Sequence, residues 1–200
     1  PIDVTRSRVF DGLTDRERHA CLEPASTVEI KRRQALARQG EPAARFYLVE
    51  SGLLKLLQNT ADGRQLIVRF VGPGEPFGGV VALGPGEYPV TALAVESVRC
   101  RAWTQDALAN LLDDYPRLRV NIMREVAAHM TDALTRVREL VSERVGQRLA
   151  HTLLRLARQS GTPTADGIVL AHPLTRQELA ELADTTIYTV SRTLSAWQER

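Results

Sequence analysis

Two short amphipathic segments near the end of the chain carry the residue pattern with the most specific chemistry. The first runs from Leu174 to Ala183, where Thr175 is placed to cap a helix and Glu178, three residues on, completes a capping box. Its apolar face is formed by Leu179, Leu182 and Ala183. The segment therefore predicts a short helix with one buried side and one polar side.

A tight connection at Asp184-Thr185 leads to the second segment, from Thr186 to about Trp197. Ala180 is small where two such helices would cross closely, and Asp184 tolerates the left-handed backbone that this turn often needs. Two helices joined in this way form a helix-turn-helix, whose second helix enters the major groove of DNA. We therefore expect binding to double-stranded DNA, and the alternative is a small helical domain without a ligand.

The charge of this motif does not favour DNA by itself, because acidic residues outnumber arginines between positions 174 and 200. The segment from Arg136 to Arg158 holds six arginines against Glu139 and Glu143. We expect that segment to supply positive charge for the phosphates.

The few histidines and cysteines limit other kinds of chemistry. Between Val28 and Trp103, where a barrel is expected, there is no histidine for the metal site of a cupin-like enzyme, which is the alternative function. We therefore expect no enzyme. Cys21 and Cys100 have no partner motif, so buried thiols are expected and no metal site is. His19 and His129 are the candidate haem ligands of a gas sensor.

Short apolar runs separated by glycines fill the stretch from Val28 to Trp103 and predict an antiparallel β-barrel. Asp62-Gly63 is a hairpin signal between two of these runs. The β-rich runs are Phe46–Val49, Leu53–Leu57, Leu66–Val71 and Thr91–Val98. The fold class is thus α+β, with an all-β first half.

A helix capped by Thr104 is expected to end near Tyr115, and Pro116 suits the first turn of the next. From Arg117 to about Leu140 there is no Pro or Gly, and apolar residues alternate at spacings of three and four. This heptad seam predicts a parallel homodimer through Met123, Val126, Met130, Ala133, Val137 and Leu140. A second stripe is expected to pack on the barrel; it holds Leu118, Ile122, Leu134 and Val141. Gly146 is expected to bend or end the helix, and the segment from Gly161 to Gly167 reads as a connector.

No apolar run is long enough to span a bilayer and no signal peptide is visible, so a cytoplasmic protein is expected. The net charge of +2 is too small to indicate a nucleic-acid partner by itself.

The order of barrel, long helix and helix-turn-helix resembles the Crp/Fnr family of transcriptional regulators over essentially the whole chain. The matching strings are Phe46–Gly52, Asp62–Gln65, Gly72–Gly78 and Thr175–Ala180. The resemblance implies a jelly-roll barrel like that of cyclic-nucleotide-binding proteins, residues 1–116, with an effector pocket. It also implies a dimerisation helix, residues 117–145, and a DNA-binding domain, residues 146–200, with RNA polymerase as a further partner. The family's winged motif continues into a β-hairpin, whereas this sequence stops at Arg200, so the wing is absent, trimmed or unseen.

In cyclic-nucleotide-binding members a Glu holds the ribose and an Arg with a Ser or Thr holds the phosphate. Here the corresponding positions are Gly79, Pro89 and Val90, beside Phe77 and Gly78, so this effector pocket is expected to be degenerate. A buried phosphate without a cation is poorly compensated, and cyclic AMP is therefore not the expected effector. Haem or nitric oxide sensing, or activity without an effector, remains open. The segments Gly86–Ala94 and Thr185–Arg192 look like Fnr-like members of the NnrR and DNR type.

The resemblance also implies which residues meet DNA. The base-reading positions correspond to Ile187, Tyr188, Ser191 and Arg192, of which Arg192 can bind guanine through two hydrogen bonds. Tyr188 stands where Crp and Fnr carry a Glu, so their half-sites are not assumed. The DNA backbone contacts are expected from Thr175, Arg176, Gln177, Thr186 and Thr189.

Overall fold

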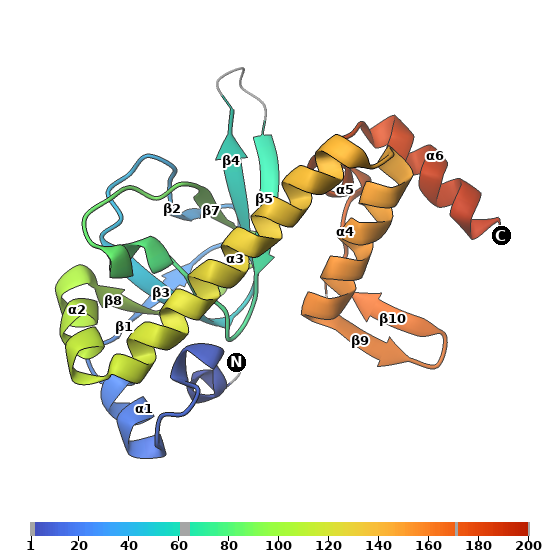
Figure 1. Ribbon diagram of the computed structural model, residues 1–200. Coiled ribbons are helices and arrows are strands. Elements are labelled where there is room, and N and C mark those ends of the chain that lie inside the picture. The colour runs from blue at the N-terminus through green and yellow to red at the C-terminus, as the bar shows by residue number, and fades with distance from the viewer. Residues whose placement is uncertain (1–2, 61–64, 171, 200) are drawn as a thin grey trace.

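The structure is a computed structural model that describes residues 3–60, 65–170 and 172–199. Two four-stranded antiparallel sheets share one core (Figure 1). The strand order of the first sheet is β1 (Ser26–Ile30), β8 (Val98–Thr104), β3 (Arg45–Ser51) and β6 (Pro76–Phe77). In the second sheet the order is β2 (Ala35–Ala37), β7 (Thr91–Ala94), β4 (Leu54–Asn59) and β5 (Gln65–Val71). The predicted antiparallel jelly roll is confirmed.

One predicted strand differs in the structure, and one predicted turn falls on residues that the structure does not describe. The run Thr91–Val98 is not one strand, since β7 ends at Ala94 and β8 begins at Val98 in the other sheet. β4 and β5 pair antiparallel from Leu54 with Val71 to Asn59 with Gln65. The hairpin signal Asp62-Gly63 between them lies outside the described residues.

Helices close one end of the barrel. The chain enters through two 3-10 turns, Val4–Arg6 and Arg8–Phe10, followed by α1 (Asp15–Leu22). Thr104 caps α2 (Gln105–Asp114), as predicted, by accepting from the Ala107 backbone N–H. Cys21 and Cys100 are both buried, which confirms the expectation for the two thiols.

The long helix α3 (Pro116–Ser142) crosses the barrel and leads to the helical part at the other side (Figure 1). Pro116 occupies its first turn, as predicted. The expected bend at Gly146 is wrong, because Glu143 and Arg144 have extended backbones and Gly146 lies in the first turn of α4 (Val145–Ser160). A break two residues earlier therefore sets the angle between α3 and α4.

The segment expected as a connector is instead a β-hairpin, in which β9 (Gly161–Thr164) pairs with β10 (Gly167–Leu170). Two short helices follow, α5 (Arg176–Leu182) and α6 (Ile187–Gln198). Gly167 has a φ of 142°, a conformation that favours glycine where the hairpin turns. The helical part therefore contains a small sheet that the sequence interpretation missed.

A second apolar core joins the helical part to the outer face of the β4–β5 sheet. The barrel contributes Leu53, Leu57, Ile67 and Phe70 to it. The helices contribute Leu149, Leu156, Leu179, Ala180, Ala183 and Val190. Because α5 packs on β5 and α6 packs on α5, the orientation of both helices depends on the barrel.

Within the part of the chain that the structure describes, no helix has the length and apolar character needed to cross a membrane.

Candidate DNA interface and effector pocket

The helix-turn-helix is fixed by local geometry at its cap and its turn. Thr175 caps α5 and exchanges both hydrogen bonds of a capping box with Glu178, as the spacing predicted. Asp184 has a φ of 48°, so the expected left-handed residue is present at the turn. The Thr185 N–H donates to the Ala180 carbonyl at 2.9 Å. Ala180 and Val190 are buried where the two helices meet.

Arg148 of α4 stabilises the turn between α5 and α6 through hydrogen bonds. Its guanidinium donates to the carbonyl oxygens of Ala183 at 3.1 Å and Asp184 at 3.0 Å. A third hydrogen bond reaches the Glu143 carbonyl at 3.0 Å. One side chain therefore ties the end of α3 to the turn before α6. No local pattern in the sequence signals this role, because its partners are backbone atoms 35 and 36 residues away.

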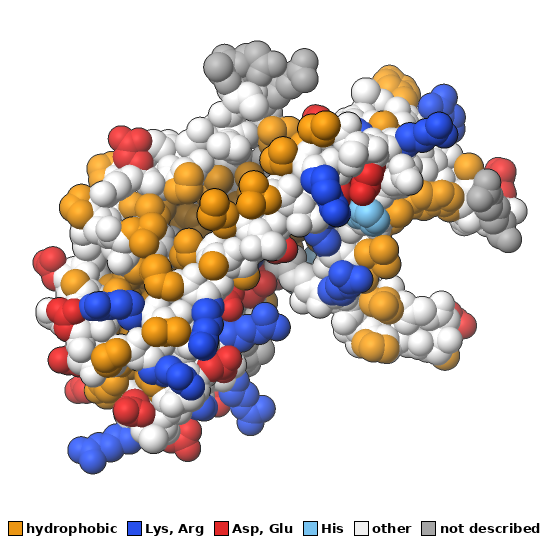
Figure 2. All heavy atoms as spheres, in the orientation of Figure 1, with side chains coloured by type: hydrophobic (Ala, Val, Ile, Leu, Met, Phe, Trp, Pro, Cys, Tyr) orange, Lys and Arg blue, Asp and Glu red, His pale blue; other side chains and the backbone are white. Residues whose placement is uncertain are grey.

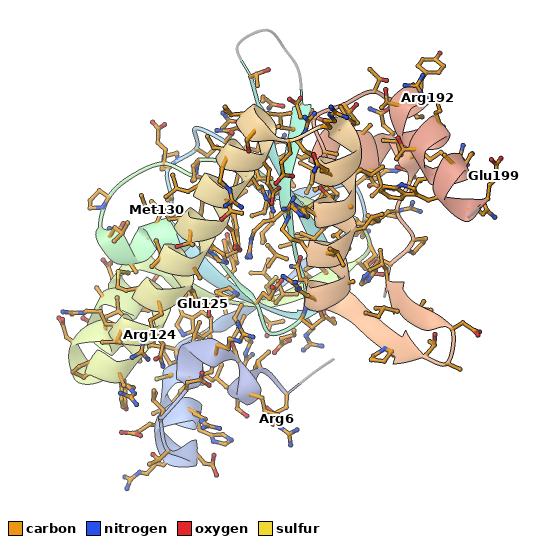
Figure 3. The ribbon with its side chains drawn as sticks, turned by 45° about the vertical axis from the view of Figure 1, so that its right-hand side comes forward. Arg6, Arg124, Glu125, Met130, Arg192 and Glu199 are labelled. Carbon is orange, nitrogen blue, oxygen red and sulfur yellow. The ribbon has the colours of Figure 1, made fainter. Side chains whose placement is uncertain are left out.

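The four expected base-reading residues share one exposed face of α6. Tyr188 is 83% exposed and Ile187 39%, Arg192 is exposed, and Ser191 is half-buried. Figure 3 shows Arg192 on the side of α6 remote from the barrel. Among the described residues, no hydrogen bond or ion pair occupies the Arg192 guanidinium, which leaves its donors available for a base edge.

The expected backbone-contacting residues surround the two helix starts. The hydroxyl groups of Thr175 and Thr186 accept from backbone N–H groups as helix caps, and Thr186 Oγ1 lies 3.0 Å from Thr189 Oγ1. Gln177 donates to Glu181 at 2.9 Å. Arg176 is exposed beside them. These residues lie at the caps and in the first turns of α5 and α6.

The six arginines between positions 136 and 158 lie in different surroundings. Arg148 is engaged by the turn, and Arg155 donates to both carboxylate oxygens of buried Glu139 at 2.7 and 2.8 Å. Arg136 is half-buried beside them. Only Arg138, Arg144 and Arg158 of this set are exposed. These three remain available to phosphates, and the supply of positive charge by this segment stays a prediction.

The predicted seam on α3 divides into two parts. Met123 and Val126 are half-buried, and Met123 packs against the barrel core of its own chain. Met130, Ala133, Val137 and Leu140 are exposed. The second stripe also divides, because Leu118 and Ile122 are buried while Leu134 and Val141 are 61% and 85% exposed. The expectation that Leu134 and Val141 pack on the barrel is therefore wrong.

The exposed apolar residues of both stripes form one surface along the second half of α3. Figure 2 shows hydrophobic side chains gathered along and beside this helix. Met130, Leu134, Val137 and Val141 follow the four-three-four spacing of a heptad seam. Monomeric soluble proteins rarely expose a contiguous apolar row of this kind, so the row indicates a contact with a partner.

The turn at the expected effector pocket is packed and sterically tight. The ring of Phe77 stacks between Tyr47 and Tyr88, with ring centroids 6.0 and 5.5 Å apart. Gly78 has a φ of 82°, and a Cβ there would lie 2.7 Å from the Arg45 carbonyl oxygen. At Gly79 a Cβ would lie 2.9 Å from a methyl group of Val126 on α3. A longer side chain at position 79 would therefore press on α3.

Comparison with known proteins agrees with this architecture. Residues 27–115 match the cyclic nucleotide-binding domain family, and residues 147–200 match the Crp-like helix-turn-helix domain family. The Cyclic AMP receptor protein of Thermus thermophilus is 30% identical over 193 residues, which cover 96% of this chain and 86% of the relative. The chain belongs to the Crp/Fnr family.

One further relative and one solved structure are similar to this Crp/Fnr protein over most of its length. The CRP-like cAMP-activated global transcriptional regulator of Mycobacterium tuberculosis is 27% identical, covering 98% of this chain and 88% of the relative. The structure of FixK2 from Bradyrhizobium japonicum superimposes with a TM-score of 0.77 at 23% identity, covering 88% of this chain and 85% of that one. This Crp/Fnr protein is a transcriptional regulator with a DNA-binding helix-turn-helix.

The two candidate haem ligands of this Crp/Fnr protein lie in different surroundings. His19 is exposed on α1, where its Nδ1 is 2.6 Å from the Asp15 carbonyl oxygen. His129 lines a cleft beside α3, and burial and the charge of Arg69 lower its pKa to about 4. His129 is therefore neutral near pH 7, the state that a metal ligand needs. Within the described ranges, no group of three or more His, Cys, Asp or Glu is arranged to hold a metal ion.

Proposed function

We propose that the protein is a homodimeric regulator that reads an inverted repeat with α6, under an effector other than cyclic AMP or without one. The observation that carries this proposal is the exposed face of α6, on which Arg192 has no partner within the described residues. A guanidinium held on a rigid helix can donate two parallel hydrogen bonds to guanine O6 and N7. Ile187, Tyr188 and Ser191 share its face and complete the proposed reading surface.

Dimerisation is proposed through the exposed apolar surface of α3. The predicted seam residues that are exposed are Met130, Ala133, Val137 and Leu140, and Leu134 and Val141 extend the surface. Pairing two such helices in parallel would bury the row and bring two copies of α6 to one side of the dimer. The two-fold symmetry of the dimer then requires a two-fold symmetric operator.

The barrel turn supports an effector other than cyclic AMP. Gly79, Pro89 and Val90 supply neither a carboxylate for ribose nor a cation for a cyclic phosphate. A Cβ at Gly79 would lie 2.9 Å from a methyl group of Val126, so a longer side chain at that position requires Val126 to shift. Two relatives are named for cyclic AMP. At Gly79, Pro89 and Val90 this chain lacks the polar residues that cyclic-nucleotide-binding members of the family carry.

The finer family assignment belongs to the same proposal. We assign the chain to the Fnr-like branch on the segments Gly86–Ala94 and Thr185–Arg192, with haem or nitric oxide as candidate signals. The proposed parts are an effector-sensing barrel (1–116), a dimerisation helix (117–145) and a DNA-binding domain (146–200). RNA polymerase is the proposed protein partner.

Selection of duplexes from a random-sequence pool tests the proposed function. The purified full chain should enrich a defined motif, and its affinity for the selected duplex should exceed that for a scrambled duplex by at least about a thousandfold at physiological salt. Equal affinity for the selected and scrambled duplexes would contradict a sequence-specific regulator. The alternative of a helical domain without a ligand predicts no enrichment at all.

A further inference from the structure

A cavity of about 280 Å³ lies in the cleft between the barrel and the DNA-binding helices. Strand β5 forms one wall, α3 the second, and α4 with α5 the third. Apolar side chains dominate much of this lining, among them Leu66, Ile67, Leu140, Leu182 and Ala183. Cavities of this size at a boundary between domains are typical small-molecule sites.

One end of the cavity is strongly basic. Arg69, Arg136, Thr152 and Arg155 line it and also line an adjoining cavity of about 20 Å³. The second cavity has room for about one water-sized group. Three guanidinium groups from β5, α3 and α4 thus meet at the boundary between a large apolar space and a small polar one.

The acidic groups at the cleft leave this positive charge only partly compensated. Buried Glu139 already accepts two hydrogen bonds from Arg155, and His151 Nδ1 lies 3.4 Å from it. Asp132 and Asp184 are exposed, and Glu181 accepts from Gln177 at 2.9 Å. Asp132 attracts both Arg69 and Arg136, and Glu75 and Glu125 also act on Arg69, so the basic end is partly compensated while Glu139 is already engaged.

Arg136 shows most clearly that a hydrogen-bond acceptor is missing at this end of the cleft. Its Nε is fully buried and makes no hydrogen bond to any of the described residues. Burial and the nearby charges of Arg155 and Arg69 lower the pKa of Arg136, and burial lowers that of Arg69. A buried donor without a hydrogen bond is costly, and such a group in a native structure calls for an explanation, for which a bound anion is one candidate.

We propose that this cleft binds a small organic anion, whose carboxylate or phosphate group is held by Arg69, Arg136 and Arg155 and whose apolar body lies against Ile67 and Leu182. The anionic group would accept the free Arg136 Nε–H and form charge-assisted hydrogen bonds with the other guanidinium groups. Thr152 offers a hydroxyl at the same end. The ligand would contact the barrel, α3 and the DNA-binding helices at once.

The position of the cleft suggests what the ligand does. Ala183 and Asp184 line the cleft and are also the residues whose carbonyl groups Arg148 holds at the turn before α6. A ligand seated there would stabilise the arrangement of α5 and α6 relative to the barrel. That the anion is an effector of DNA binding rests on the proposed function, whereas its binding to the cleft does not.

Thermal unfolding and calorimetry of the full chain with three matched probes test the proposal. Benzoate and phenyl phosphate carry the two anionic groups on one apolar body, and benzamide is the neutral control. At least one of the two anions should bind saturably in the millimolar range or tighter and raise the unfolding temperature, while benzamide should not. Absence of saturable binding by both anions, or equal binding of benzamide, would overturn the proposal.

Arg136→Met separates a binding role from a structural one. The variant should weaken binding of the anion at least tenfold, yet unfold without ligand at the same temperature as the wild type or higher, because an uncompensated buried charge is removed. Arg138→Met, an exposed arginine on the same helix, should change neither property. Unchanged anion binding by Arg136→Met, or a lower unfolding temperature of its ligand-free form, would contradict the proposal. DNA affinity measured without ligand tests the proposed function separately.

Discussion

Arg192 is the side chain on which proposed base recognition depends most directly. It is exposed on α6, in a helix whose start is fixed by the Thr186 cap and the Asp184 turn. Arg192→Ala should cost about 1 to 3 kcal/mol on the selected duplex and relax selectivity at one base pair, because a two-bond contact with guanine is lost. Fluorescence anisotropy on the selected and singly substituted duplexes measures both effects.

Arg16→Ala is the matched control, because it removes the same charge from an exposed position on α1. It should leave the base preference unchanged. An equal loss of affinity by Arg192→Ala on random DNA would instead show that Arg192 contacts phosphate.

The barrel turn leads to a second prediction at the level of single residues. With Gly79, Pro89 and Val90 in place of polar groups, cyclic AMP should bind no more tightly than about 1 mM, which corresponds to about 4 kcal/mol of binding free energy. Calorimetry on the purified protein measures this, with the Thermus thermophilus relative named for cyclic AMP as the reference. Micromolar binding coupled to tighter DNA binding would refute the proposed pocket.

His129 predicts part of the pH dependence of stability. Its pKa is lowered from 6.5 to about 4 by burial first and by the charge of Arg69 second, while Asp132 partly opposes this. Arg136 lines the same cleft. The unfolded chain therefore binds a proton near pH 6.5 that the folded protein accepts only near pH 4. The contribution of His129 to the free energy of unfolding should be fully present above pH 6.5 and be lost as the pH is lowered toward 4.

Denaturant unfolding at several pH values tests this sign. His129→Gln should show a smaller loss of unfolding free energy between pH 6.5 and 4 than the wild type. His19→Gln, changed at an exposed histidine, is the control. An identical slope for His129→Gln and the wild type would show that His129 does not contribute.

At the level of helices, α3 connects barrel packing to dimerisation. Its first half is buried against the barrel through Leu118 and Ile122, and its second half exposes Met130 and Val137. Met130→Glu should weaken the dimer at least tenfold, or by about 1.4 kcal/mol or more, because the charge would be desolvated against its symmetry mate. Figure 3 shows Met130 on the side of α3 away from α4, where a partner helix can reach it.

Sedimentation equilibrium measures the effect, and Ala128→Glu introduces the same charge at an exposed position on another side of α3. That control should remain dimeric. A dimer of unchanged strength for Met130→Glu would show that this row of residues is not the interface.

Which features the sequence predicted follows from the range of the interactions involved. The capping box of α5 and the left-handed conformation of Asp184 depend on residues within one turn, so the local sequence was sufficient to predict them. The hairpin β9–β10 was missed although Asp166-Gly167 followed by three apolar residues is a signal for it, because Pro163 suggested a loop. The positions of Arg136, Arg148 and Arg155 depend on how α3, α4 and the barrel meet. Local patterns contain no information on such contacts.

For the whole molecule, the barrel and the DNA-binding helices form one continuous body. Their shared core is reinforced across the boundary by Lys55 with Glu178 at 3.5 Å and by His172 with Glu96 at 3.0 Å. Gln159 of α4 also donates to the Phe70 carbonyl at 2.9 Å. A change in the barrel or in the cleft therefore has a direct structural route to α6.

A hydroxyl-radical footprint of the full chain on its selected duplex tests the central claim most directly. Two copies of α6 related by two-fold symmetry should protect two half-sites whose centres lie about one helical turn, roughly 34 to 36 Å, apart. The protection should be symmetric about the midpoint and should require the same sequence in inverted orientation on both sides. Protection of a single asymmetric half-site, or protection without sequence preference, would contradict a dimeric, sequence-specific regulator.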